Sequence, residues 1–192
     1  MTPSDFHRQR CITFFGQFLS YFLLPFISPD WSLSQQIESL SAYAHLAAAL
    51  HLKHGTACLT GALYADSQAV VKNIVFITAR LQIMDGNLTF FIIQEGTDRL
   101  EGLFGDTRTQ DHSRNFDIKQ LCEKLSIATL IDGAFERNPE LDRGHRRLSI
   151  LGTLGIDHIN PKSWKGDTHV GNVDLHIQWE NGRQKAINLL RE

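Results

Sequence analysis

Residues 28–55, "SPDWSLSQQIESLSAYAHLAAALHLKHG", favour a helical fold. The stretch opens with turn and cap residues, and Gly55 supplies a C-terminal stop. Between these ends, apolar side chains recur at helical spacing: Ile37, Leu40, Ala44, Ala47 and Leu50. The pattern therefore predicts one amphipathic helix.

The next stretch, residues 62–86, has the same spacing. Asp66 or Ser67 is expected to cap it, and Asp85-Gly86 to end it. The side chains predicted to form its buried stripe are Val70, Ile74, Ile77 and Leu81. A second helix is therefore expected here.

Two later stretches also predict helices. Residues 115–139 favour one long or two short helices, closed by Pro139. Residues 170–192 can form a last helix, which Asn181-Gly182 is expected to interrupt. Its apolar side chains are Val173, Ile177, Ala186 and Leu190.

One short segment departs from the helical pattern. Residues 88–94 lie within "NLTFFIIQ", which is rich in β-branched and aromatic residues and predicts a strand-like segment. A lone strand cannot form a sheet, so its partners are either irregular or missing from this chain. The expected fold class is mainly α, with three parts: an apolar segment at 1–30, a helical domain at 31–165 and a C-terminal helix at 166–192.

Composition excludes several classes of protein. Hydrophobic residues make up 42% and charged residues 21% of the 192 residues, which is typical of a folded domain. The net charge of −2 gives no global attraction to nucleic acid or anionic lipid, so such binding requires a local patch. Cys11, Cys58 and Cys122 are far apart, which argues against a disulfide framework or a thiolate zinc site and favours a reducing, intracellular compartment.

The N-terminal end imitates a signal peptide, because "HRQR" at 7–10 precedes an apolar run. Polar residues and Pro25 interrupt that run, and no small-x-small cleavage site follows. We therefore expect an amphipathic helix that ends near Pro25, and no membrane partner. The side chains expected on its apolar face are Phe15, Phe18, Leu19 and Phe22.

Two groups of cations are weak candidates for ligand binding. His51 and His54 stand three residues apart, as metal ligands on one helix face would, but no third ligand is near, and His also favours the last turn of a helix. Arg146 and Arg147 could bind nucleic-acid phosphates through their guanidinium groups, although acidic neighbours make an ordinary charged surface the main alternative. No pattern in the sequence indicates a small-molecule substrate.

Residues 95–109, "EGTDRLEGLFGDTRT", are the main candidate for chemistry. If Asp98 begins a helix, Glu101 lies on the same face as Arg108, and a carboxylate held by a helix suits Mg²⁺. The alternative is structural, because Asp98 and Glu101 have the spacing of a capping box. Glu101 is therefore either a metal ligand or the third residue of a cap.

This stretch resembles the signature around the last catalytic carboxylate of P-element-type transposases, which are often joined to a THAP DNA-binding domain. The matching positions are Asp98, Leu100, Glu101, Phe104, Gly105 and Arg108. The resemblance implies that Glu101 is the final acid of a ribonuclease-H-like site that holds two divalent metals. It also implies DNA or another transposase-derived chain as a partner, with Arg108 near the nucleic acid, and a nuclear location.

The family pattern also requires two earlier aspartates on strands. Asp5, Asp30, Asp66 and Asp85 all fall at predicted caps, turns or the terminus. We therefore expect an incomplete remnant of a ribonuclease-H-like region, which is inert alone and holds Mg²⁺ only if the missing aspartates are supplied. Two other hypotheses stay open: a helical interaction module unrelated to DNA, and a metal nuclease that is active by itself.

Overall fold

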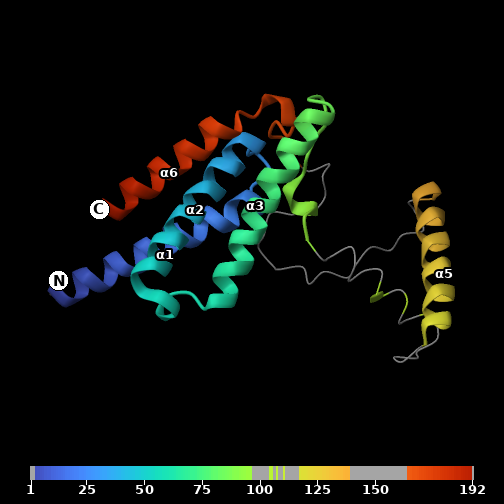
Figure 1. Cartoon of the computed structure of the whole chain (residues 1–192), viewed down its shortest axis with the longest axis horizontal. Helices are drawn as coiled ribbons and strands as arrows, with labels where there is room; N and C mark the ends of the chain where they lie inside the picture. Colours follow the sequence, from blue (N-terminus) through green and yellow to red (C-terminus); the bar gives the residue numbers. More distant parts are fainter. Residues whose placement is uncertain are drawn as a thin grey trace. The chain divides into compact units, whose positions relative to one another are not determined.

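The computed structural model describes residues 3–96, 104–105, 107, 110, 117–138 and 164–191. These residues are mainly helical, which confirms the predicted fold class at that level. The chain forms two compact units, Met1–Glu95 with Ile156–Glu192 in one and Gly96–Gly155 in the other (Figure 1).

The first unit is a bundle of four helices, α1 (Pro3–Ile27), α2 (Leu33–His54), α3 (Gly61–Met84) and α6 (Leu175–Arg191). Three 3-10 turns connect or precede them: η1 (Gly55–Ala57), η2 (Ile92–Gln94) and η5 (Val170–Asn172). Helix α2 contacts each of the other three helices and lies between α1 and α6 (Figure 1). It is therefore the centre of the unit.

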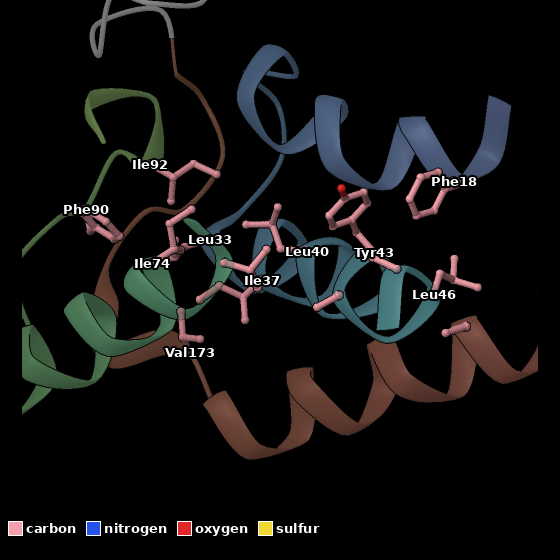
Figure 2. Close-up of a cluster of buried hydrophobic side chains, with 14 of the residues drawn as sticks. Phe18, Leu33, Ile37, Leu40, Tyr43, Leu46, Ile74, Phe90, Ile92 and Val173 are labelled. Atoms are coloured by element: carbon pink, nitrogen blue, oxygen red, sulfur yellow. The ribbon is translucent and has the colours of Figure 1, made fainter. Parts of the chain in front are cut away.

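Helix α2 begins as the sequence predicts and is buried more completely than predicted. Ser32 caps it, with its hydroxyl accepting from the backbone N–H of Gln35, and the Gln35 side chain accepts from the Ser32 backbone N–H. The four predicted residues from Ile37 to Ala47 are buried, and Leu50 packs against them. Side chains on other faces of the helix are also buried, among them Ala42, Tyr43 and Leu46 (Figure 2). An amphipathic surface helix would bury only one stripe.

Aromatic rings join α1 to α2. The ring centroids of Phe18 and Tyr43, which face each other in Figure 2, lie 4.8 Å apart. Those of Phe22 and Tyr43 lie 4.6 Å apart. Phe15 and Leu19 were expected on this same face, but they are exposed. The apolar residues of α1 therefore divide between two faces, of which only one packs on α2.

Helix α1 ends at Ile27, near Pro25 as expected from sequence, and Pro25 lies within its last turn. A proline has no N–H to donate to the carbonyl four residues before it, here Tyr21. The Ser39 hydroxyl of α2 donates to that carbonyl at 2.9 Å. Gln36 Nε2 donates to the carbonyl of Pro25 itself at 3.1 Å. Two polar side chains of α2 thus stabilise the last turns of α1.

Helix α3 begins earlier than predicted. Thr60 is its cap, with its hydroxyl accepting from the Leu63 N–H at 3.2 Å, so Asp66 and Ser67 lie inside the helix. Val71 and Ile74 are fully buried, whereas three of the predicted stripe residues, Val70, Ile77 and Leu81, are only partly buried against the core. The buried face is therefore shifted slightly around the helix from the predicted one.

The strand-like segment finds its partner within the chain. Thr89 forms one antiparallel bridge with His169, and residues 92–94 then form the turn η2. The Phe90 N–H donates to the Thr168 carbonyl, and the Val170 N–H donates to the Leu88 carbonyl, both at 2.9 Å. The described residues contain no further strand pairing, so the expected incomplete sheet is replaced by a single irregular bridge.

Helix α6 runs through Asn181-Gly182 without the predicted interruption. A Cβ at Gly182 would clash with the Glu38 carbonyl and would lie 2.5 Å from the Ser41 Cβ. The Ser41 hydroxyl donates to the Trp179 carbonyl at 2.6 Å, and Lys185 pairs with Glu38 at 2.7 Å. Gly182 therefore allows the backbones of α2 and α6 to approach closely, and it does not break the helix.

In the second unit, residues Ile118–Arg137 form one continuous helix, α5. Asp117 and Gln120 build a capping box at its start. Lys124 is buried, and its ammonium donates to the Thr107 carbonyl at 3.2 Å. Thr107, within the candidate stretch 95–109, is thus held against α5.

We expect Ser39→Ala to lower the free energy of unfolding by about 1–2 kcal/mol, because the Tyr21 carbonyl loses its donor. In a Pro25→Ala background the alanine N–H can bond that carbonyl, so the same change should cost less. Urea unfolding of the four proteins gives a double-mutant cycle, and a coupling of about 1 kcal/mol is expected. Additive effects would contradict this role of Ser39.

We expect Gly182→Ala to lower the free energy of unfolding by about 1–3 kcal/mol, because its methyl group forces α2 and α6 apart. The matched control is Gly61→Ala at the first position of α3, where an added Cβ meets nothing within 4 Å. Alanine there should leave stability unchanged or raise it, since alanine favours helix. Equal effects in the two variants would contradict the close approach at Gly182.

Candidate functional site

The candidate site residues from the transposase resemblance, Asp98, Glu101 and Arg108, lie outside the described part of the chain. So do Arg146 and Arg147, the candidates for binding phosphates. Among the described residues, no group of three or more His, Cys, Asp or Glu side chains could hold a metal ion. The geometry of the described units therefore does not test the predicted metal ligands.

His51 and His54, near the end of α2, have different surroundings. The His51 ring stacks on Tyr64, with centroids 4.2 Å apart and planes 4° apart. His54 instead lines a groove at the end of the bundle. The stacking gives His51 a packing role between α2 and α3.

An exposed apolar face on α1 is the largest feature that the sequence analysis missed. Five large side chains between 38% and 65% exposed lie on it: Ile12, Phe15, Leu19, Leu23 and Ile27. We call these five residues the α1 stripe. Their spacing of three or four residues places them along one side of the helix, whose edge at Phe15 adjoins the packed rings of Phe18 and Phe22. The signal was present in the sequence, since α1 is apolar nearly all round.

The same helix is long and apolar enough, over Arg8–Ile27, to cross a membrane by length and composition alone. Core helices of soluble proteins and signal sequences satisfy the same criterion. In this bundle, α1 also accepts hydrogen bonds from Ser39 and Gln36 of α2 and packs two aromatic rings on it. One face of α1 is thus part of the core, and the other is the α1 stripe.

A groove of about 1010 Å³ opens beside the α1 stripe, at the end of the bundle that holds the N-terminus of α1 and the C-terminus of α6 (Figure 1). Phe15 belongs to both features. The remaining apolar lining comes from Phe14, Leu50, Ala57, Leu189 and Leu190. Polar lining includes Arg10 and His54, and the thiols of Cys11 and Cys58 also reach the groove.

A second polar cluster surrounds Asp167. Its carboxylate accepts from the His169 backbone N–H at 3.0 Å, the His169 Nδ1 at 2.8 Å and the Asn172 amide at 2.6 Å. These bonds, led by that of the backbone N–H, lower the pKa of Asp167 from 3.8 to about 2. The Asp167 carbonyl in turn accepts from the Leu33 N–H at the start of α2. No nucleophile is hydrogen-bonded to this pair among the described residues, so the cluster anchors residues 165–172 to the bundle.

We expect the Asp167 cluster to make stability depend on pH in the acid range. The pKa of this carboxyl is lower in the folded chain, so its stabilisation is present above pH 4 and is lost as pH falls towards 2. Its side chain is 45% exposed, which limits the contribution to about 1 kcal/mol. In urea unfolding, the difference between the wild type and Asp167→Asn should shrink from pH 5 to pH 2. Asp66→Asn, at an exposed position on α3, is the control, and a difference that does not change with pH would contradict the mechanism.

Comparison with known proteins leaves the family open. No protein-family model, curated protein or solved structure matches this chain. The transposase resemblance of residues 98–108 therefore stays a prediction from sequence.

Proposed function

We propose that this chain is a helical protein-interaction module whose contact surface is the α1 stripe. The observation that carries the proposal is the exposure of five large apolar side chains on one face of a helix whose other face is packed in the core. Contiguous apolar surface of this kind is typical of contact sites, whereas single exposed apolar residues are normal.

The energetics of the α1 stripe are consistent with binding. Full burial of a large aliphatic or aromatic side chain contributes about 1.5–3 kcal/mol, so five roughly half-exposed side chains leave roughly 5 kcal/mol to be gained. The helix is already ordered by its contacts with α2, which reduces the entropy lost on binding. The burial of these side chains would therefore stabilise a complex between α1 and a partner that presents a complementary apolar face.

The charge on this face distinguishes a protein partner from DNA. Binding to DNA requires several Lys or Arg contacts to phosphates. At about 100° per residue, Arg8 lies on the same side of α1 as the stripe, whereas Arg10 does not. One arginine cannot make several phosphate contacts, so the charge on this face favours a protein partner over DNA. The hypothesis of a transposase-derived function rests on residues 98–108. Under that hypothesis, the α1 stripe would be a contact surface of a protein derived from a transposase.

The proposal is tested by photo-crosslinking in cells. A photoreactive phenylalanine analogue at Leu19, on the stripe, should give protein adducts that mass spectrometry identifies and that Phe15→Glu removes. The same analogue at Leu52, which is 87% exposed but lies on α2 outside the stripe, is the matched control and should give none of these adducts. Equal adducts at both positions, or adducts only with DNA or lipid at position 19, would show that the α1 stripe is not a protein contact surface.

A further inference from the structure

We propose that the partner of the α1 stripe is a second copy of this chain, with the two α1 helices antiparallel about a two-fold axis at Leu19. This inference rests on the proposed function, because it names the occupant of the same surface. A two-fold interface requires one surface patch that is complementary to itself. The sequence of α1 meets that condition in its spacing, in the sizes of its side chains and in its charge.

The spacing allows two α1 helices to touch along their whole length. From Ile12 the stripe continues to Phe15, Leu19 and Leu23 in steps of three, four and four residues. Eleven residues over three turns correspond to about 3.67 residues per turn, close to the 3.6 of a straight helix. From Ile12 to Leu23 the exposed residues therefore stay on one face, and two such faces can meet without strong supercoiling.

The antiparallel register pairs side chains of matching character. With Leu19 facing Leu19 at the axis, Phe15 of one copy lies opposite Leu23 of the other, and Ile12 lies one residue, about 1.5 Å along the axis, from the position opposite Ile27. Every member of the α1 stripe then has an apolar partner. A parallel pair would place each residue against its own copy instead, which sets Phe15 against Phe15 and Arg8 against Arg8.

Charge also favours the antiparallel arrangement. In this arrangement Arg8 of one copy lies near the C-terminal end of α1 in the other, beside the turn that carries Asp30. Helix α1 has no basic residue in its own last turn, where a cation would favour the helix dipole, and Arg8 of the second copy supplies one. Asp30 approaches Lys165 at 3.6 Å, but both side chains are more than 70% exposed, so this pair can rearrange at little cost.

A lipid surface is the alternative occupant, and it fits less well. Helices that lie in a membrane interface carry Lys and Arg along a polar face beside the apolar one. In α1 the face opposite the stripe is packed against α2, and the basic residues Arg8 and Arg10 lie in its first turns, with none between Cys11 and Ile27. The charge distribution of α1 therefore favours a second copy of the α1 stripe over a lipid surface as the occupant.

Cysteine crosslinking of the full chain tests the register. In a background where the exposed Cys11, Cys58 and Cys122 are replaced by serine, Leu19→Cys should give a disulfide-linked dimer under mild oxidation, because this residue faces its own copy. Ile12→Cys and Ile27→Cys should each give little dimer alone and much more when the two variants are mixed. Leu52→Cys is the exposed control and should stay monomeric.

Sedimentation of the wild-type chain tests the association without crosslinks. We expect a concentration-dependent dimer, which Leu19→Glu weakens at least about tenfold by placing two carboxylates at the axis. Arg8→Asp and Asp30→Arg should each weaken it, and the double variant should recover affinity, since every copy then carries both reversed charges. Leu52→Glu should leave the dimer intact.

The outcomes separate the two proposals. A monomeric chain whose position 19 still crosslinks to one identified foreign protein would overturn the dimer and leave the interaction surface in place. A monomer that binds anionic vesicles through Leu19 would overturn both proposals in favour of a lipid surface. Strong self-crosslinking of Ile12→Cys alone would overturn the antiparallel register.

Discussion

The fold of the first unit depends on the burial of α2 on nearly all sides. A helix in that position meets the backbones of its neighbours directly, and every polar group at those contacts must find a partner. Three polar side chains of α2 meet this constraint as donors, although Gln36 Oε1 and His51 Nδ1 are buried without a hydrogen-bond partner. Gln36 and Ser39 donate to carbonyls of α1, and Ser41 donates to a carbonyl of α6. In the other direction, Gln68 of α3 donates to the Ala44 carbonyl of α2 at 2.9 Å. Serine and glutamine side chains between the helices therefore contribute, beside leucine and isoleucine, to where the neighbouring helices lie.

The same constraint explains the two faces of α1. Pro25 would destabilise the end of this helix if it stood alone, because the Tyr21 carbonyl would have no donor. Contact with α2 supplies the donor and orders the helix up to Ile27. The outer face of α1 is ordered as well, because Leu23 and Ile27 belong to the same continuous helix as Ile12. The hydrogen bonds and packing between α1 and α2 thus also order the exposed stripe. Because the stripe is already ordered, it is suitable as a preformed contact surface.

The candidate site was predictable only in part. Residues 95–109 stand out because carboxylates and an arginine occur there at helical spacing, and such a pattern is visible without coordinates. The α1 stripe does not stand out in the same way. Phe15, Phe18, Leu19 and Phe22 are all apolar and close in sequence, so periodicity assigns them to one face. Only the position of α2 shows that Phe18 and Phe22 are inside while Phe15 and Leu19 are outside.

The sequence by itself determined that this protein is mainly α, where α2 lies and that Gly55 caps its end, because local spacing and cap chemistry act within a few residues. It also indicated that 88–94 departs from helix. The tertiary structure decided which residues this segment meets, and it decided that Gly182 lies inside a continuous helix.

A glycine or a proline has the same local preference everywhere, but its effect depends on a neighbour distant in the chain. Gly182 is required by the Glu38 backbone, and Pro25 is tolerated because of the Ser39 hydroxyl. These long-range contacts leave no periodic signal in the sequence.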